Sequence, residues 1–135
     1  QIILNLSINA RDAMPAGGEL FVETRTQTFV DNVPGREDAE PGTYVVLTVT
    51  DSGYGIPPEI QDRIFEPFFT NKENGTGLGL FTVYSIVKNH NGWIQVDSRV
   101  GEGATFQLYF PAAAFTARDQ EADTVNDVTG ETESQ

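Results

Sequence analysis

Two asparagines near the start of the chain have a spacing that suits metal binding. Asn5 and Asn9 lie four residues apart in "QIILNLSINARDAM", where apolar residues recur at helical spacing, so both amides project from one face of a helix. Amide oxygens can bind Mg²⁺, which takes a few protein oxygens and completes its shell with water and phosphate. The alternative is that both amides bond the neighbouring backbone, and the spacing by itself favours that alternative.

A carboxylate stands at the end of a predicted strand. Asp51 closes the β-branched run "TYVVLTVTD" and opens "DSGYGIP", in which Gly53 and Gly55 would let a flat ring approach the backbone. A buried carboxylate in this position can accept from an amino-bearing ring, and it rejects an oxo-bearing ring that would leave the acceptor unpaired. The alternative is an ordinary Asp-Ser-Gly turn, which is common.

A glycine-rich stretch, "TNKENGTGLGL", precedes a predicted helix. Gly75, Gly77 and Gly79 lead into the helix N-terminus, which presents free backbone N–H groups to an anion, and Lys72 adds a point charge for phosphate. Three phenylalanines in the preceding "IFEPFFTNK" either anchor a mobile lid or belong to the core. Neither the Walker spacing nor the dinucleotide-binding spacing is present, and a flexible connector explains the glycines equally well.

The periodicity predicts the elements that position these residues. They are a helix over 1–14, strands over 18–29 and 43–51, a short helix from Pro57 or Pro58, a helix over 77–90 and a hairpin over 93–110. This order predicts an α+β fold, a two-layer sandwich with a mixed sheet under helices. Because the chain opens in mid-helix without a cap, we expect it to be N-terminally truncated. The single histidine, His90, stands at a helix end and is expected to cap it.

Composition narrows the function classes. The chain of 135 residues has no cysteine, which excludes disulfides and cysteine zinc sites, and its net charge of −12 argues against nucleic acid as a partner. No apolar run is long enough to cross a bilayer, so a cytoplasmic location without direct membrane contact is expected. Residues 112–135 are acidic and poor in large apolar residues, which predicts a disordered linker or tail.

Four segments, taken in order, resemble the ATP-binding catalytic domain of sensor histidine kinases, in the superfamily shared with gyrase, Hsp90 and MutL. "NLSINARDAM" resembles their N box, "DSGYGIP" and "NGTGLGL" their two glycine boxes, and "IFEPFFTNK" their phenylalanine box. The resemblance covers residues 1–111 and implies a Bergerat-type sandwich with ATP between the helix layer and a mobile lid. Without nucleotide, the lid is expected to be among the least ordered parts of the domain.

The resemblance also implies a role for each matching residue. Asn9 would be the principal Mg²⁺ ligand with Asn5 assisting, and Asp51 would accept from the adenine amino group. Gly53 and Gly55 would shape the adenine pocket. The lid and phosphate contacts would come from Lys72, Gly75, Thr76, Gly77, Leu78 and Gly79, with Asn5, Asn9 and Lys72 assisting the reaction.

Departures from the family pattern refine the expected activity. Asn5 stands where the ATP-hydrolysing relatives carry a glutamate, and an amide cannot act as a general base, so phosphoryl transfer is favoured over hydrolysis. Ala104 stands where the family often has Ser or Thr, and Thr105 is expected to face the other side of its strand.

The expected partners lie outside the chain. They are a histidine-containing dimerisation domain and a response regulator receiver, and without the former this piece is not expected to autophosphorylate. A gyrase- or Hsp90-like ATPase and a non-catalytic nucleotide-binding module remain the alternatives.

Overall fold

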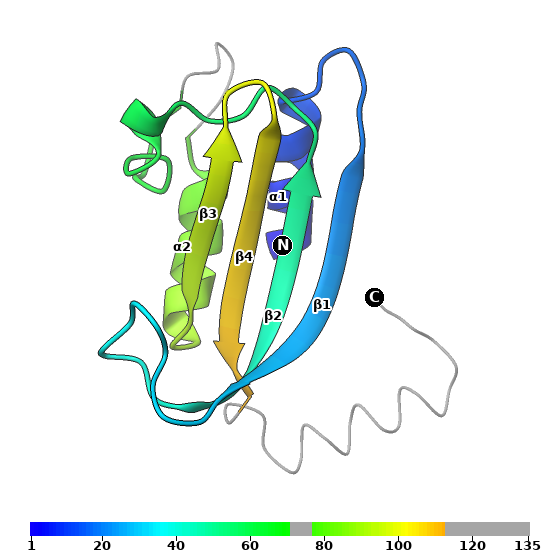
Figure 1. Cartoon of the computed structure of the whole chain (residues 1–135). Helices are drawn as coiled ribbons and strands as arrows, with labels where there is room; N and C mark the ends of the chain where they lie inside the picture. The colour runs from blue at the N-terminus through cyan, green and yellow to red at the C-terminus, as the bar shows by residue number, and fades with distance from the viewer. Residues whose placement is uncertain (71–76, 113–135) are drawn as a thin grey trace, which may run out of the picture.

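Two helices lie on one face of a four-stranded sheet in the computed structural model of the chain, which describes residues 1–70 and 77–112 (Figure 1). This arrangement confirms the predicted two-layer α+β sandwich. The elements in chain order are α1 (Ile2–Asp12), β1 (Leu20–Phe29), β2 (Gly42–Asp51), a 3-10 helix η1 (Pro58–Ile60), α2 (Gly79–Asn89), β3 (Trp93–Arg99) and β4 (Gly103–Pro111).

The prediction of a mixed sheet is wrong, because all described strands pair in antiparallel fashion. The strand order is β1-β2-β4-β3, with antiparallel pairing at each of the three contacts. β2 and β3, which are joined through α2, do run in the same direction. The hairpin strand β4 inserts between them, so the two never pair with each other.

Alternation along the strands gives the sheet two different faces. The face under the helices carries Leu47 and Val49 of β2, which pair in register with Leu108 and Phe106 of β4. These side chains pack against Leu6 of α1 and against α2 residues Val83 and Val87 in the main core. A smaller cluster on the opposite face consists of Val33, Tyr44, Val46, Trp93 and Tyr109.

Both helices end close to the predicted positions, 14 and 90. α1 stops at Asp12, shortly before Pro15, and α2 stops at Asn89, after which Asn91 takes a left-handed φ of 61°. His90 Nδ1 lies 2.8 Å from the carbonyl oxygen of Ile86 in the last turn, as expected of a capping residue. In the described part of the chain, no helix has the length and apolar character needed to span a membrane.

Truncating a side chain of the main core is expected to cost stability without touching the site. Leu108 is fully buried at the centre of β4, so Leu108→Ala removes its packing and leaves a cavity. We expect a loss of about 3 kcal/mol in the free energy of unfolding. Urea unfolding followed by circular dichroism measures this loss. Leu4→Ala, at a residue that is 59% exposed, is the matched control and should change the free energy by less than about 0.5 kcal/mol.

Candidate functional site

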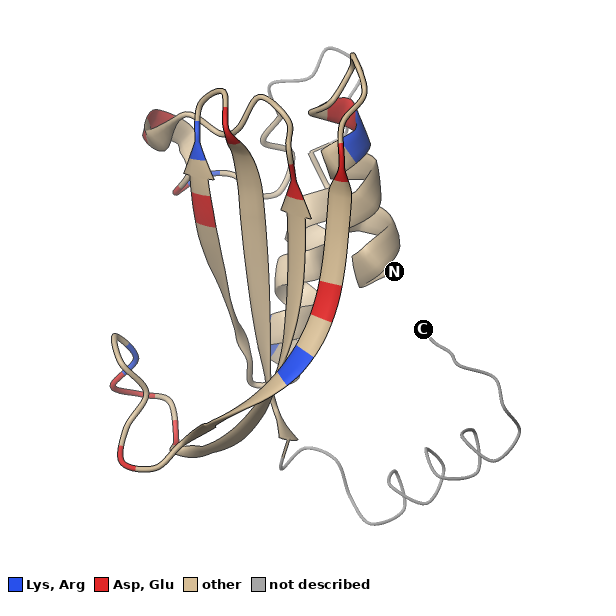
Figure 2. Ribbon diagram, turned by 45° about the vertical axis from the view of Figure 1, so that its right-hand side comes forward, with Lys and Arg blue, Asp and Glu red and all other residues tan. Residues whose placement is uncertain are grey.

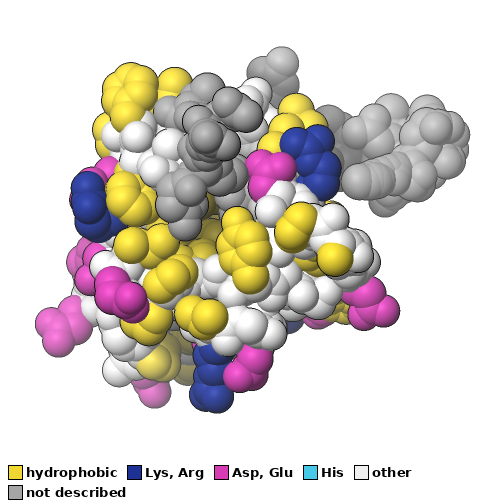
Figure 3. All heavy atoms as spheres, turned by 90° about the horizontal axis from the view of Figure 1, so that it is seen from above, with side chains coloured by type: hydrophobic (Ala, Val, Ile, Leu, Met, Phe, Trp, Pro, Cys, Tyr) yellow, Lys and Arg dark blue, Asp and Glu magenta, His cyan; other side chains and the backbone are white. Residues whose placement is uncertain are grey.

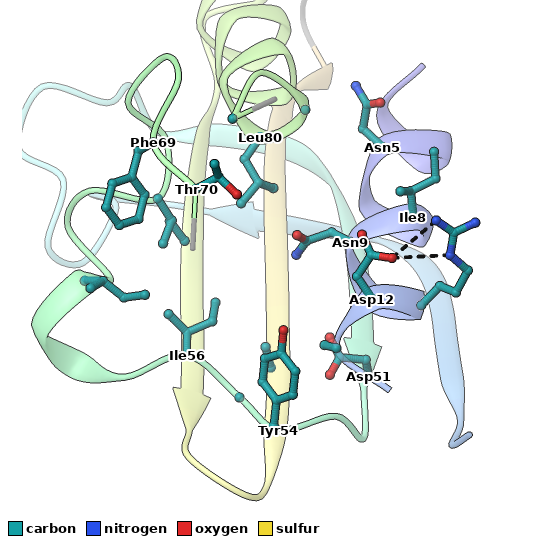
Figure 4. Close-up of a pocket in the computed structure, with 18 of the residues that line it drawn as sticks. Asn5, Ile8, Asn9, Asp12, Asp51, Tyr54, Ile56, Phe69, Thr70 and Leu80 are labelled. Carbon is teal, nitrogen blue, oxygen red and sulfur yellow. Dashed lines mark hydrogen bonds and ion pairs between the residues drawn. The ribbon is translucent and has the colours of Figure 1, made fainter. Parts of the chain in front are cut away.

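A cavity of about 410 Å³ opens between α1, the end of β2 and the start of α2 (Figure 4). It lies at the end of the sheet where β2 finishes, and Figure 3 shows apolar side chains gathered over this end with charged ones mainly around the edge. Its wall contains most of the described residues that the sequence singled out, namely Asn5, Asn9, Asp51, Gly55, Gly77 and Gly79.

The two asparagines are half-buried on the face of α1 that lines the cavity. Asn9 points toward the middle of the cavity, and Asn5 lies one turn earlier, facing the start of α2 (Figure 4). Within residues 1–70 and 77–112, neither side-chain amide has a hydrogen-bond partner. The alternative that they bond the neighbouring backbone therefore finds no support, and both amides are available to a ligand.

Asp51 is the one buried charged residue in the described part of the chain, at 6% exposure. Its Oδ1 accepts a hydrogen bond of 2.8 Å from the backbone N–H of Gly53, which fixes the orientation of the carboxylate. The second oxygen, Oδ2, has no partner among the described residues, and the residue lines the cavity. A buried acceptor is thus presented to whatever the cavity holds.

The two glycines that follow Asp51 are required by close backbone contacts. A Cβ on Gly53 would lie 2.3 Å from the carbonyl oxygen of Ala13, and one on Gly55, whose φ is +81°, would lie 2.1 Å from that of Arg99. Between them, the backbone N–H of Tyr54 donates to the Ala13 carbonyl oxygen at 3.0 Å, and the backbone carbonyl of Tyr54 accepts from the Gly101 N–H at 2.7 Å. Gly55 lines the cavity, whereas Gly53 acts from behind by orienting Asp51.

The glycine-rich stretch enters the described structure only at its two ends. Lys72, Gly75 and Thr76, with the expectation of a mobile lid, lie outside the described residues. At the ends, the Phe68 N–H donates to the Gly77 carbonyl at 2.8 Å, so residues 68 and 77 are joined.

The start of α2 follows directly. Gly79, the first residue of the helix, lines the cavity. Leu78 is the N-cap residue and does not line the cavity, and its carbonyl oxygen accepts a hydrogen bond of 2.8 Å from Thr82 Oγ1. The helix N-terminus is thereby placed at the cavity.

The three phenylalanines before this stretch differ in their environments. Phe65 stacks on Tyr84 with 5.8 Å between ring centroids and meets Phe106 edge-on, so it belongs to the core. Phe69 lines the cavity, and Phe68 is 73% exposed with a φ of 69°. The core interpretation holds for Phe65 and Phe69, both of which pack against the main core. The interpretation as lid anchors stays a prediction, because residues 71–76 lie outside the described residues.

Sequence reasoning missed several residues of the wall. Asp12 lines the cavity beside Asn9 and forms an ion pair of 3.2 Å with Arg11 (Figure 4). Its position three residues after Asn9 placed it on the same helix face, which was a usable signal. The apolar wall gave no such signal, because its members read as ordinary core positions; it includes Ile56, Ile60, Ile64, Phe69 and Leu80.

The predicted orientation of Thr105 is confirmed. Ala104 pairs in register with Asp51 and lines the cavity, where its methyl group offers no hydrogen bond. Thr105 faces the other side of the sheet, and its Oγ1 lies 3.2 Å from Thr50 Oγ1. The floor of the cavity next to the buried carboxylate is therefore apolar.

The donor set of the cavity limits the metals that it can bind. The described residues contain no group of three or more His, Cys, Asp or Glu side chains that could hold an ion by themselves. A metal at the Asn5 and Asn9 amides would need further oxygens from a ligand, which is the typical situation of Mg²⁺ on a polyphosphate. The cavity volume lies within the roughly 300–1,000 Å³ of small-molecule sites.

Comparison with known proteins defines the class. A family model described as "Histidine kinase-, DNA gyrase B-, and HSP90-like ATPase" matches residues 1–114, and the chain belongs to this family. The family membership and the observed sandwich confirm the resemblance that the four sequence segments indicated.

Curated proteins that match the chain include sensor kinases. The chain is 40% identical to the sensor kinase CckA of Brucella abortus (strain 2308), over 96% of the chain and 15% of the relative. It is 42% identical to the sensor histidine kinase ZraS of Salmonella typhimurium, over 84% of the chain and 22% of the relative. The chain thus spans less than a quarter of the length of these relatives.

Solved structures agree with the fold. The mycobacterial sensor histidine kinase MprB matches with a TM-score of 0.62 and 31% identity, covering 82% of this chain and 67% of that one. Full-length ShkA, in complex with AMPPNP, matches with a TM-score of 0.62 and 28% identity, covering 82% of this chain and 20% of that one.

Proposed function

We propose that this chain binds Mg-ATP and donates the γ-phosphoryl group to a histidine on a separate dimerisation domain, in two-component signal transduction. The observation that carries the proposal is the buried Asp51 carboxylate, with one oxygen fixed by Gly53 and the other presented to the cavity. Family membership and the nucleotide analogue in the ShkA complex support ATP as the ligand.

Adenine would occupy the part of the cavity between Asp51 and the apolar wall. Asp51 Oδ2 would accept from the adenine amino group, while Gly55 and Ala104 keep space for the ring beside it. A purine with an oxo group in place of the amino group would leave the buried carboxylate facing an acceptor. ATP should therefore bind far better than GTP.

The phosphates would extend toward α1 and the start of α2. Asn9 and Asn5 would hold Mg²⁺ together with phosphate oxygens, and the bound ion would neutralise charge on the phosphates. Lys72, Gly75, Thr76, Gly77, Leu78 and Gly79 are proposed as the lid and phosphate contacts, as the family motif implies. The chain's own contribution is then to orient the phosphates and stabilise their charge.

One observation favours hydrolysis as a second candidate function. Asn5 cannot activate water, but the Asp12 carboxylate also lines the cavity, one turn beyond Asn9. Asp12 is engaged with Arg11, and a carboxylate held in an ion pair is a poor base for abstracting a proton from water. Transfer is therefore the leading proposal, and the two activities differ in where the γ-phosphoryl group ends.

The test of this proposal follows labelled phosphate. The full chain is incubated with γ-labelled ATP, Mg²⁺ and a histidine-containing dimerisation domain from a related sensor kinase. We expect label on that domain, labile to acid and stable to base, and no label on the chain by itself. Steady release of inorganic phosphate without labelled protein would contradict transfer and support the ATPase alternative.

The remaining assignments are part of the same proposal. Residues 1–111 would be the catalytic domain and residues 112–135 an acidic linker or tail, in a cytoplasmic portion of a larger sensor protein. A response regulator receiver would take the phosphoryl group downstream. Neither nucleic acid nor direct membrane contact is proposed, because the net charge of −12 opposes anionic surfaces.

A further inference from the structure

A second cavity lies at the opposite end of the sheet from the nucleotide site. Its volume is about 660 Å³, and it is bounded by the loop between β1 and β2, the end of α2, the start of β3 and the end of β4 (Figure 1). We call it the distal pocket. The residues of its wall that matter for the argument are Arg36, Tyr44, Lys88, Trp93 and Pro111.

Trp93 contributes an unpaired hydrogen-bond donor to the distal pocket. The indole is 4% exposed and stacks on Tyr109, with 4.7 Å between ring centroids, while Tyr44 meets it edge-on at 5.0 Å. Its Nε1 is buried and has no acceptor among the described residues. A buried N–H without an acceptor costs about 1–3 kcal/mol, so an acceptor reaching this atom would gain that much.

Arg36 lies over the Trp93 ring and carries a second unpaired donor. Its guanidinium carbon lies 5.1 Å from the centroid of the Trp93 ring, and its Nε is also buried without an acceptor. No carboxylate pairs with Arg36 in the described part of the chain. Arginine is the side chain best suited to bind carboxylates through two parallel hydrogen bonds, and here that capacity is unused.

The formal charges of the wall cancel, with two cations, Arg36 and Lys88, against two carboxylates. Lys88 adds a second cation, whereas Asp38 and Glu40 are exposed carboxylates on the same loop as Arg36 (Figure 2). The Tyr44 hydroxyl donates to the Glu40 backbone oxygen at 2.6 Å, and burial, together with the Glu40 charge, raises the pKa of Tyr44, so the phenol stays neutral. Selection of a ligand therefore depends on the two unpaired donors and not on a general positive field.

The chain itself supplies a segment of the right chemistry at this place. Pro111 belongs to the wall, and the chain continues from it into a stretch that carries six acidic residues and one arginine. Asp119 follows Pro111 by eight residues, which span up to about 26–29 Å when extended, so the acidic group can reach any part of the pocket. Tethering of this kind gives an effective concentration on the order of millimolar, which compensates for weak contacts.

We propose that the distal pocket binds the acidic segment 119–123 of the same chain, whose carboxylates accept hydrogen bonds from Arg36 and Trp93. The acidic residues of that segment are Asp119, Glu121 and Asp123. This contact would hold the segment that follows Pro111 at the end of the domain remote from the nucleotide site.

The protein has a built-in reporter for this contact, because Trp93 is its only tryptophan. The full chain is compared with the full-length variant Asp119→Asn/Glu121→Gln/Asp123→Asn. We expect the variant to show a shifted emission maximum and greater quenching by acrylamide, a neutral quencher. The matched control, Glu131→Gln/Glu133→Gln, removes two acids further along and should behave as the parent chain.

A peptide of residues 113–135 tests the same contact in trans. Added to the neutralised variant, it should restore the parent emission in a saturable way, and Arg36→Gln in that variant should weaken binding about tenfold or more, equal to about 1.4 kcal/mol. Arg99→Gln, at an exposed arginine of β3, is the control and should leave binding unchanged.

Three results would overturn the proposal. The first is identical emission and quenching in the parent and neutralised chains. The second is peptide binding that ignores Arg36→Gln. The third is equal binding of an unrelated acidic peptide to the parent chain and to the neutralised chain. The chain's own acidic segment would then not occupy the pocket, and the pocket would serve a partner protein.

Discussion

Replacement of Asp51 by asparagine is expected to reduce the affinity for ATP by about 100-fold or more, which corresponds to about 2.7 kcal/mol. In the parent chain, Oδ1 is held by the Gly53 N–H and Oδ2 faces the cavity. In Asp51→Asn, keeping the Gly53 hydrogen bond requires the amide oxygen at that position. The amide nitrogen then faces the cavity and meets the amino group of adenine, donor against donor.

Calorimetric titration with Mg-ATP measures this loss of affinity. Asp97→Asn is the matched control, because Asp97 is an exposed carboxylate on β3, and it should leave the affinity unchanged. Thermal unfolding should show that Asp51→Asn still folds. Equal ATP affinity in the parent chain and in Asp51→Asn would contradict the assignment of this carboxylate to adenine.

Replacement of Asn9 by alanine is expected to remove the dependence of ATP binding on Mg²⁺. The amide of Asn9 points into the cavity and has no partner among the described residues, so its loss leaves no unpaired group behind and the fold should tolerate it. Without this oxygen the ion loses its principal protein ligand. Transfer to a dimerisation domain should fall roughly 100-fold, because charge stabilisation at the phosphates is lost.

The Asn9 variant is read out by titrating ATP with and without Mg²⁺. The parent chain should bind more tightly in the presence of the ion, whereas Asn9→Ala should bind with the same, weaker affinity in both conditions. Asn5→Ala should lose only part of the Mg²⁺ effect, and Asn32→Ala, in the exposed loop after β1, should lose none. A full Mg²⁺ effect in Asn9→Ala would refute the role of this amide.

Much of the fold could be predicted from local signals. The helices predicted over 1–14 and 77–90 and the strands predicted over 18–29 and 43–51 all appear in the structure close to where the sequence indicated them. Sheet order could not be read in this way, because no local signal says that β4 returns between β2 and β3. That insertion made the sheet antiparallel.

The candidate site shows the same division. The spacing of Asn5 and Asn9 and the strand-terminal position of Asp51 singled out three residues that line one cavity in the structure. Asp12 lies three residues after Asn9 on the same helix face, and it also lines the cavity. The pairing of Arg36 with Trp93 was beyond any local pattern, since the two residues belong to distant segments that only the folded loop brings together.

The most direct test of the central claim is to map the bound nucleotide onto the chain by nuclear magnetic resonance. Titration of the full chain with Mg-ATP should shift the backbone amide signals of Asn9, Gly55 and Leu80, which line the cavity, and leave those of Gln95 and Gln107 on the opposite sheet face unchanged. Mg-GTP at the same concentration should shift none of them. Shifts confined to other parts of the chain, or no shift with Mg-ATP, would contradict the assignment of this cavity to ATP.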